Sequence, residues 1–316
     1  MSRIGLAARA LRLTISRTHA DPTADYDAAS PSYDTYFSPV MGVHSLAALD
    51  EVLIRPGDDV LELACGTGHL TQEIVRRLGG RGSVRAVDKS PGMLAVARAK
   101  VEPEVELSPG IELSLEEGDM EEFLLARPTG SADLVVIGWA ICYSKPARLL
   151  EQVRRVLRPG GRVVVIETRG DALKTLITQL EKVFAADPSL LTGLIRVSLP
   201  KDAATVARWF GKAGLTVDVQ RDGHQLLPAE TPEAALEWVQ RSGAAAGFKD
   251  AVDQSREQYA LDLIRDGLAR QVAQHGPLEL RHTFVVVTGR SPGGPADGSP
   301  VGGGSADAHR KEVGSA

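Results

Sequence analysis

The stretch that most constrains the fold is a short apolar run that breaks into a glycine loop. Residues 60–63, Val-Leu-Glu-Leu, are typical of a buried strand. The loop Ala64-Cys65-Gly66-Thr67-Gly68 then opens a helical pattern whose apolar face carries Leu70, Ile74, Val75 and Leu78. Glycines in such a turn let another molecule approach the backbone, and the free N–H groups of a helix N-terminus attract an anionic group. The stretch therefore predicts a strand, a tight turn and a helix built around a ligand.

A second signal lies twenty positions beyond Gly68. Residues 84–87, Val-Arg-Ala-Val, indicate another strand, and Asp88 follows it directly. An acidic side chain at this spacing is expected to reach a ribose hydroxyl across the ends of the strands. The two glycines alone would fit a structural turn equally well. Together with Asp88 and the two strands they favour a nucleotide-like ligand.

The rest of the chain continues the alternation of strands and helices. Further strands are expected at 111–115, 132–138, 162–166, 216–220 and 281–287, with helical patterns between them. The strand at 132–138 is apolar on both faces, as a covered parallel sheet requires. This order predicts the α/β class, with a doubly wound, Rossmann-like, seven-stranded and mostly parallel sheet that has helices on both faces.

Five segments resemble, in sequence and in order, the class I S-adenosylmethionine-dependent methyltransferases. They are VLELACGTGHL at 60–70, AVDKSPGML at 86–94, EEGDMEE at 116–122, ADLVVIGWA at 132–140 and RVLRPGGRVVVIE at 155–167. The likeness covers most of residues 26–168 and is closest to the branch of ubiquinone and menaquinone C-methyltransferases and related small-molecule methylases. It departs at Ala64, where many members have glycine. We expect no positive φ at that position, so the alanine methyl group should interfere little with the loop conformation.

The resemblance implies S-adenosyl-L-methionine as the cofactor. Asp88 would bind the ribose, Asp119 would accept a hydrogen bond from the adenine amino group, and the Met120 N–H would meet a ring nitrogen. Met93 would pack on the adenine, and Tyr33 would close over the cofactor from an N-terminal cap. Each of three residues also has a purely structural explanation. Asp119 could be an exposed turn residue, Met93 a core residue, and Tyr33 a residue that packs the cap on the core. The implied cofactor residues are Tyr33, Glu62, Ala64, Gly66, Gly68, Asp88, Lys89, Met93, Asp119, Met120, Gly138 and Trp139.

The expected chemistry is methyl transfer to a small, hydrophobic or aromatic metabolite that is quinol-, phenol- or polyketide-like. The sulfonium carries an activated methyl group, so positioning and exclusion of water supply most of the catalysis, up to roughly 7–11 kcal/mol in ideal cases. Removal of a proton from the acceptor would need a base. The candidate catalytic residues are Glu167, His44 and Tyr143, with His224 as a further one, and each is also explained as a structural or solvated residue. His69 is expected to support the cofactor turn.

The net charge and the motifs present limit the possible partners and substrates of the protein. A net charge of −5 argues against a broad nucleic-acid surface. The Asn-Pro-Pro-Tyr motif of methylases that act on DNA amines or glutamine amides is absent. No apolar run approaches the roughly 20 residues that span a bilayer, so we expect no stable membrane insertion and a cytoplasmic location. Cys65 and Cys142 are expected to be reduced, and no metal site is expected. A monomer or a homodimer would fit.

We expect three parts in the chain. Residues 1–45 form an N-terminal segment and cap, 46–290 the methyltransferase domain, and 291–316 a disordered tail rich in Gly, Pro, Ser and Ala. Helices at about 171–200 and 228–277 are expected to cover the substrate. Residues 1–20 carry four arginines and no acidic residue, so they could contact an anionic membrane weakly. A frayed or loosely docked end is the favoured interpretation.

Two other functions use similar folds. An NAD(P)-dependent oxidoreductase is disfavoured because Thr71 stands where the third glycine of a Gly-x-Gly-x-x-Gly motif belongs. A non-catalytic binding protein of the same fold is disfavoured because Glu62, Asp88 and Asp119 are all present. Methyl transfer is the preferred hypothesis.

Overall fold

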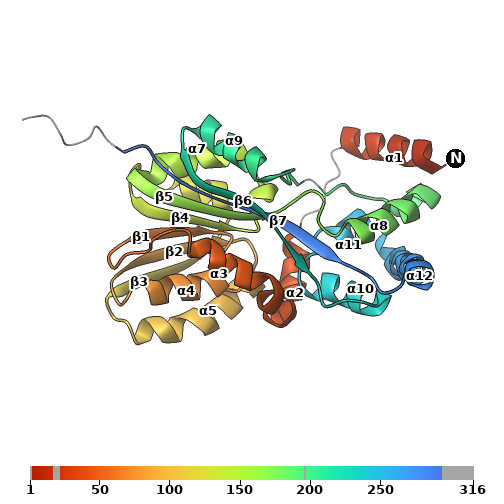
Figure 1. Ribbon diagram of the computed structural model, residues 1–316, viewed down its shortest axis with the longest axis horizontal. Helices are drawn as coiled ribbons and strands as arrows, with labels where there is room; N and C mark the ends of the chain where they lie inside the picture. Colours follow the sequence, from red (N-terminus) through yellow and green to blue (C-terminus); the bar gives the residue numbers. More distant parts are fainter. Residues whose placement is uncertain (1, 17–21, 196, 294–316) are drawn as a thin grey trace, which may run out of the picture.

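The computed structural model describes residues 2–16, 22–195 and 197–293. A seven-stranded sheet with the order β3-β2-β1-β4-β5-β7-β6 forms its centre (Figure 1). The first five strands are parallel, and β7 is antiparallel to both of its neighbours. This confirms the predicted fold class. The strands are β1 (Asp59–Leu63), β2 (Gly82–Asp88), β3 (Ile111–Glu117), β4 (Ala132–Gly138), β5 (Leu157–Thr168), β6 (Thr216–Leu226) and β7 (Arg281–Arg290).

Helices cover both faces of the sheet. One layer contains α3 (Val43–Leu49), α4 (His69–Arg77) and α5 (Pro91–Glu106), and the other contains α6 (Met120–Leu125), α7 (Pro146–Val156) and α9 (Ala203–Ala213). Alternate side chains of a strand point to opposite faces. Accordingly Val60 packs with the first layer, whereas Leu61 and Leu63 pack with the second. The near-continuous apolar runs of the inner strands follow from this double cover.

Two strands exceed their predicted ranges by the most residues. β5 begins at Leu157 and includes the Arg158-Pro159-Gly160-Gly161 segment, which lies before the strand expected at 162–166. β6 continues to Leu226, because it forms a long antiparallel hairpin with β7. β6 is an edge strand whose residues are mostly exposed or half-buried, so its second half has the polar composition of a loop.

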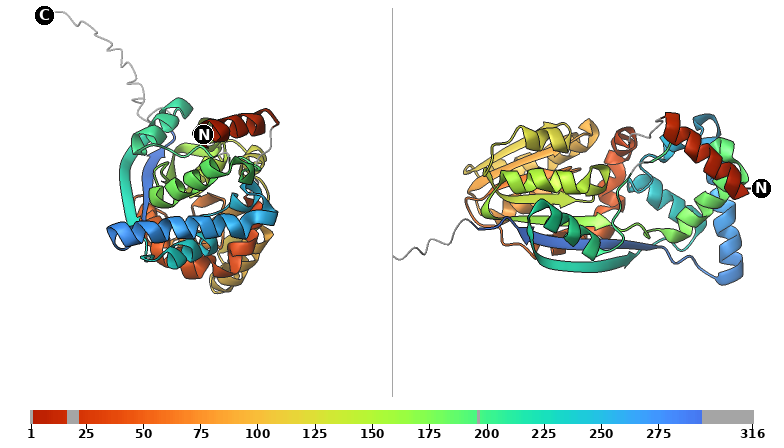
Figure 2. Two further views of the ribbon diagram at one scale, coloured as in Figure 1. Left: turned by 90° about the vertical axis from the view of Figure 1, so that its right-hand side faces the viewer. Right: turned by 90° about the horizontal axis from the view of Figure 1, so that it is seen from above.

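A helical lobe stands at one end of the sheet (Figures 1 and 2). It contains α1 (Ser2–Ser16), α2 (Thr23–Tyr36), α8 (Lys174–Ala186), α10 (Pro232–Arg241), α11 (Phe248–Ala251) and α12 (Glu257–His275). α12 packs against α8 and α10, and α10 packs against α2. The lobe includes the helices that we expected to cover the substrate.

The N-terminal helix α1 packs on this lobe against α8. Arg9 donates a 2.8 Å hydrogen bond to the Leu191 carbonyl, and Leu13 is buried. α1 is therefore held more firmly than the loosely docked end that we expected. The predicted tail of residues 291–316 lies outside the described residues from position 294 onward.

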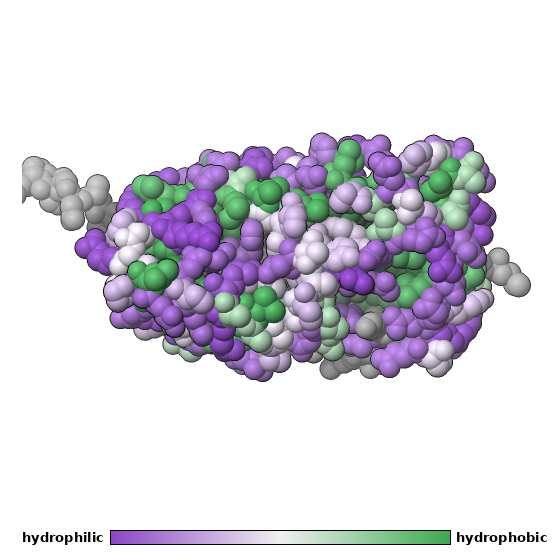
Figure 3. All heavy atoms as spheres, turned by 90° about the horizontal axis from the view of Figure 1, so that it is seen from below, coloured by the Kyte–Doolittle hydropathy of each residue, from purple (hydrophilic) through white to green (hydrophobic). Residues whose placement is uncertain are grey.

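Hydrophobic residues are scattered among hydrophilic ones on the face shown in Figure 3. Such single exposed apolar residues are ordinary for a folded protein. Within the described ranges, no helix is long and apolar enough to cross a bilayer.

Candidate active site

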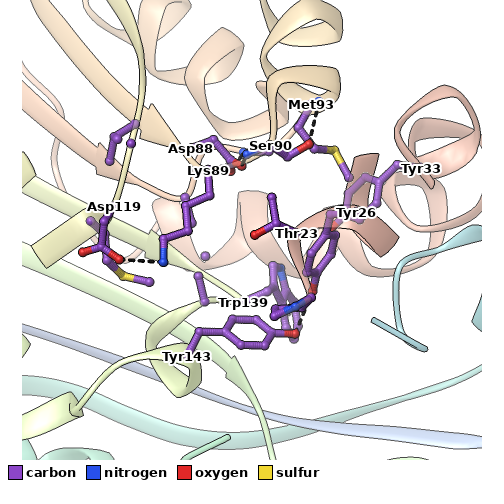
Figure 4. Close-up of a pocket in the computed structure, with 18 residues that line it drawn as sticks. Thr23, Tyr26, Tyr33, Asp88, Lys89, Ser90, Met93, Asp119, Trp139 and Tyr143 are labelled. Atoms are coloured by element: carbon purple, nitrogen blue, oxygen red, sulfur yellow. Dashed lines mark hydrogen bonds and ion pairs between the residues drawn. The ribbon is translucent and has the colours of Figure 1, made fainter. Parts of the chain in front are cut away.

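A cavity of about 380 Å³ opens at the carboxyl ends of β1, β2, β3 and β4 (Figure 4). Open α/β sheets bind their ligands at this end. One part of the lining follows the strands: Ala64, Gly66, Val87, Asp88, Lys89, Ser90, Met93, Gly118, Asp119, Met120 and Gly138. The other part comes from the N-terminal cap and the loop after β4: Pro22, Thr23, Tyr26, Tyr33, Trp139, Ala140 and Tyr143. We name these parts the strand half and the cap half.

The structure brings most of the predicted site residues together. Every predicted cofactor residue except Glu62 and Gly68 lines this cavity. Of the predicted catalytic residues, Tyr143 lines it, and Glu167 and His44 do not.

Asp88 fixes the backbone of the glycine loop. Its Oδ2 accepts a 2.7 Å hydrogen bond from the Gly66 N–H, and its Oδ1 accepts a 2.9 Å bond from the Ser90 N–H. Ser90 in turn caps α5, because its Oγ accepts from the Met93 N–H. Burial raises the pKa of Asp88. Each carboxylate oxygen has a second lone pair, so Asp88 can still accept bonds from a ligand.

Asp119 follows β3, the neighbour of β2 in the sheet, and caps α6. Its Oδ1 accepts a 2.7 Å bond from the Glu121 N–H, and its Oδ2 lies 2.8 Å from the Lys89 ammonium. Burial alone would raise the pKa of Asp119, but the Lys89 bond and the helix N–H groups outweigh it and hold the pKa below its ordinary value. The carboxylate therefore stays charged and can accept further hydrogen bonds.

Ala64 corrects one expectation. Its φ is 55°, in the left-handed region, although we expected no positive φ there. Trp139, at the end of β4, has a φ of 59°. A side chain in this region costs roughly 1–2 kcal/mol. Both strained residues line the cavity, and local strain of this kind clusters at functional sites.

Glu62 and Gly68 do not line the cavity but hold the elements around it together. Glu62 is buried, and its Oε2 accepts a 2.7 Å bond from the Thr71 hydroxyl, which joins β1 to α4. Burial raises the pKa of Glu62 to about 8. A Cβ on Gly68 would lie 3.0 Å from the Ala97 Cβ, so this glycine lets α4 approach α5 closely. Gly66 is different, since a Cβ there would meet nothing within 4 Å.

Two Tyr-Asp pairs on α2 hold the cap over the site. Asp27 accepts hydrogen bonds from the Ser90 hydroxyl and, at 2.9 Å, from the Gly92 N–H. Asp34 accepts a 2.7 Å bond from the Thr67 hydroxyl and pairs with Lys100 at 2.5 Å. The tyrosine before each aspartate lines the cavity.

Three residues of the cap half were not predicted: Tyr26, Pro22 and Thr23. The signal for Tyr26 was present, because Tyr26-Asp27 and Tyr33-Asp34 are seven positions apart. Seven residues make about two helical turns, so the two pairs share one face of α2. Tyr26 therefore belongs beside Tyr33.

The remaining candidate bases differ from the prediction in their surroundings. Glu167 is buried, where it accepts bonds from the Cys142 N–H at 3.0 Å and the Thr168 N–H at 2.7 Å. Burial raises the pKa of Glu167 to about 7. His44 hydrogen-bonds Gln225 at 2.9 Å, and His224 lies on the edge strand β6. None of these three side chains lines the cavity: Glu167 and His44 are bonded to neighbouring elements, and His224 is exposed.

The other predicted features are placed as follows. The His69 ring lies 3.4 Å from the Gly42 carbonyl and supports the start of α4. Cys65 and Cys142 are both buried and free. Among the residues that the structure describes, no three His, Cys, Asp or Glu side chains are grouped to hold a metal ion.

Comparison with known proteins identifies the family. Residues 60–161 match the family model of a methyltransferase domain. The demethylmenaquinone methyltransferase of Lactococcus lactis is 32% identical over 181 residues, which cover 53% of this chain and 69% of that protein. The chain belongs to the class I S-adenosylmethionine-dependent methyltransferases.

Other relatives agree with this family. The ubiquinone/menaquinone biosynthesis C-methyltransferase UbiE of Hydrogenovibrio crunogenus is 33% identical over 148 residues, or 45% of this chain and 56% of that protein. Among solved structures, YcgJ of Bacillus subtilis has a TM-score of 0.52 at 19% identity, with coverage of 80% of this chain and all of that one. A Bacillus halodurans structure has a TM-score of 0.52 at 18% identity, with coverage of 78% and 98%. These two structures show the fold.

The chain is thus a methyltransferase that uses S-adenosyl-L-methionine and acts on a small molecule. The cavity fits this cofactor. Its lining has two carboxylates, Asp88 and Asp119, against one cation, Lys89, and so favours a positively charged sulfonium. The open space above Gly66 leaves room for a ligand against the backbone. Family membership disfavours the NAD(P)-dependent alternative.

Proposed function

We propose that this methyltransferase acts on a hydrophobic or aromatic metabolite, such as a quinol-, phenol- or polyketide-like compound. The observation that carries the proposal is the division of one cavity between two kinds of lining. The strand half carries the charged side chains Asp88, Lys89 and Asp119, whereas the cap half is aromatic and apolar, with Tyr26, Tyr33, Trp139, Ala140 and Tyr143.

In this proposal the strand half binds the cofactor. Asp88 accepts hydrogen bonds from the ribose, Asp119 accepts one from the adenine amino group, and Met93, which is buried, packs on the ring. S-adenosyl-L-methionine supplies an activated methyl group on a sulfonium. Tyr33 stacks on Phe37 with 4.8 Å between ring centroids, and Phe37 contacts the edge of Trp139. This aromatic wall closes the site from the cap side and excludes water.

The cap half then holds the acceptor in line with the sulfonium–methyl bond. Such positioning is worth up to roughly 7–11 kcal/mol. The carboxylates in the described lining, Asp88 and Asp119, belong to the strand half, and Glu167 lies outside the cavity. The proposed reaction therefore relies on positioning and removal of water more than on a dedicated base.

The test combines binding and transfer. In calorimetry, S-adenosylmethionine and S-adenosylhomocysteine should bind at micromolar levels, and NADH should not bind. Asp88→Ala should weaken cofactor binding at least tenfold, whereas the exposed Glu279→Ala should leave it within twofold. Incubation with a labelled methyl donor and a cell extract should yield a labelled small molecule. Label found only in RNA or protein would overturn the substrate class, and an unchanged affinity for Asp88→Ala would overturn the ribose assignment.

A further inference from the structure

Two tyrosines from distant parts of the chain meet in the cap half of the cavity, on the side opposite Asp119 (Figure 4). Tyr26 comes from α2, and Tyr143 comes from the turn after β4. Their hydroxyl oxygens are 2.9 Å apart, and their rings meet edge to face with centroids separated by 6.2 Å. Both side chains line the cavity.

The hydrogen bond between these hydroxyls leaves one O–H group unused. A phenol hydroxyl carries one hydrogen and can also accept, so the tyrosine that accepts in the pair still has its own hydrogen to donate. Within the described part of the chain, neither hydroxyl has a second hydrogen-bond partner. Both tyrosines are half-buried and line the cavity, so a ligand oxygen placed here could accept this remaining hydrogen.

The surrounding chain holds both rings in place. Gly243, between α10 and α11, lies against Tyr26 so closely that a Cβ there would be 2.8 Å from the Tyr26 ring. The turn that carries Tyr143 is anchored by Glu167, which accepts the Cys142 N–H. The two hydroxyls are thus positioned before any ligand arrives, and this reduces the ordering cost of binding.

The charge around the pair favours a neutral ligand. Burial raises the pKa of both Tyr26 and Tyr143, so both stay protonated at physiological pH. The neighbouring titratable groups that act on the pair are Cys142, Glu167 and Tyr33, and none of these is a cation. The cation of the described lining, Lys89, is paired with Asp119 in the strand half. An anionic oxygen at the tyrosines would therefore have no counter-charge from the described protein lining.

We propose that Tyr26 and Tyr143 form a binding subsite for an uncharged hydroxyl or carbonyl oxygen of the methyl acceptor. The acceptor is then a neutral aromatic or conjugated compound that carries such an oxygen, rather than a carboxylate, a phosphate ester or an amine. This inference rests on the proposed function, because it places the acceptor in the cap half. It makes the tyrosine that accepts within this pair a hydrogen-bond donor to the methyl acceptor, and it makes neither tyrosine a base.

Binding of matched probes tests this subsite. We would measure the dissociation constants of 1-naphthol, naphthalene and 1-naphthoate for the protein saturated with S-adenosylhomocysteine. The wild type should bind 1-naphthol at least tenfold more tightly than naphthalene and more tightly than 1-naphthoate. In the double variant Tyr26→Phe/Tyr143→Phe, 1-naphthol and naphthalene should bind within about twofold of each other. Tyr259→Phe, which changes an exposed tyrosine, should retain the wild-type preference.

The outcomes separate this proposal from the proposed function. Binding of S-adenosylhomocysteine within twofold of wild type shows that the double variant is folded. A wild type without preference for 1-naphthol, or a double variant that keeps the preference, overturns the subsite. Tighter binding of 1-naphthoate also overturns it. If the tyrosine-dependent preference is present but labelled methyl appears only in macromolecules, the proposed function fails and the subsite stands.

Discussion

The carboxylate of Asp34 accepts a 2.7 Å hydrogen bond from the Thr67 hydroxyl, and this bond joins the cap helix α2 to the glycine loop. Lys100 of α5 pairs with the same carboxylate at 2.5 Å. The cap is thus fastened at the loop that is expected to bind the cofactor. Loss of this contact should loosen the cap and weaken cofactor binding together.

Asp34→Ala should lower the free energy of unfolding by about 1–2 kcal/mol and weaken S-adenosylmethionine binding about tenfold. Asp218→Ala is a matched control, because Asp218 is as exposed as Asp34 and pairs with Arg290 at the far end of the sheet. The control should lose less than about 1 kcal/mol and bind the cofactor within twofold of wild type. Thermal unfolding and calorimetry measure both quantities. Equal cofactor affinities for the two variants would contradict the link between cap and loop.

The two glycines of the loop should respond differently to alanine. Gly68→Ala combines a φ of 75° with a Cβ only 3.0 Å from the Ala97 Cβ, so it should destabilise the fold by about 2–3 kcal/mol. Gly66→Ala meets no atom within 4 Å and should cost about 1 kcal/mol through its φ of 55°. Its methyl group would enter the cavity, however, and should weaken cofactor binding at least tenfold. Calorimetry that finds unchanged affinity for Gly66→Ala would show that the cofactor does not occupy this space.

Ala64→Gly should stabilise the protein. Glycine removes the strain at a φ of 55°, which stabilises the folded state by roughly 1–2 kcal/mol. It also makes the unfolded chain more flexible, which lowers the free energy of unfolding by about 0.4–1 kcal/mol. We expect a net gain of about 0.5–1 kcal/mol in denaturant unfolding. The matched change Ala99→Gly, at an exposed position within α5, should lose about 1 kcal/mol. A loss of the same size for both variants would refute the strain at Ala64.

Asp119→Asn should change the base preference of the cofactor site. Asparagine can still cap α6, but its NH₂ group cannot accept a hydrogen bond from an adenine amino group. S-adenosylhomocysteine should therefore bind about tenfold more weakly. S-inosylhomocysteine, which has a carbonyl in place of the amino group, should lose less affinity or gain some. Lys89→Met is the control, since it removes the ion pair and leaves the carboxylate. If the wild type, Asp119→Asn and Lys89→Met all had the same preference between the adenosyl and inosyl compounds, Asp119 would not contact the adenine base.

Stability should depend on pH through Glu62. Its folded-state pKa of about 8 lies above the value of roughly 4.3 for an unfolded glutamate, so the folded state retains a proton between these values. Stability from this group is complete below about pH 4 and is lost as the pH rises toward 8. Glu62→Gln cannot ionise. Its free energy of unfolding should therefore rise relative to wild type by on the order of 1 kcal/mol per pH unit from pH 5 to 8.

Urea unfolding at several pH values provides the measurement for Glu62. The control is Glu279→Gln, which alters an exposed carboxylate in an ion pair with Arg281. Its stability difference from wild type should stay flat over the same range. A flat difference for Glu62→Gln as well would show that Glu62 is already ionised in the folded protein.

The sequence was most informative where burial and backbone geometry restrict the choice of residue. The run at 134–137 is apolar because β4 is covered on both faces, and the glycine loop needs residues that tolerate positive φ. These features predicted the parallel strands and the strand half of the cavity. Ser90 caps α5 for a similarly local reason, because a serine directly before a proline at the start of a helical pattern is a typical N-cap.

Features that depend on tertiary packing could not be predicted in this way. The second half of β6 is polar, because an edge strand needs only one covered face, and only its pairing with β7 identifies it as a strand. Glu167 lies near the end of β5, as a candidate catalytic residue should, but its side chain accepts the Cys142 N–H and does not line the cavity. The meeting of Tyr26 with Tyr143 joins residues 117 positions apart, which no local pattern records.

The hairpin of β6 and β7 has one further consequence. Leu226 and Arg281, the last residue of β6 and the first of β7, are paired in register, so residues 227–280 leave the sheet and return at a single point. Each doubling of a loop adds only about 0.6 kcal/mol of closure entropy. A graft of a different segment between these two anchor residues would thus leave the strands at the other edge untouched. The architecture offers an exchange point at which acceptor preference can diversify while the strands that carry the glycine loop, Asp88 and Asp119 are inherited intact.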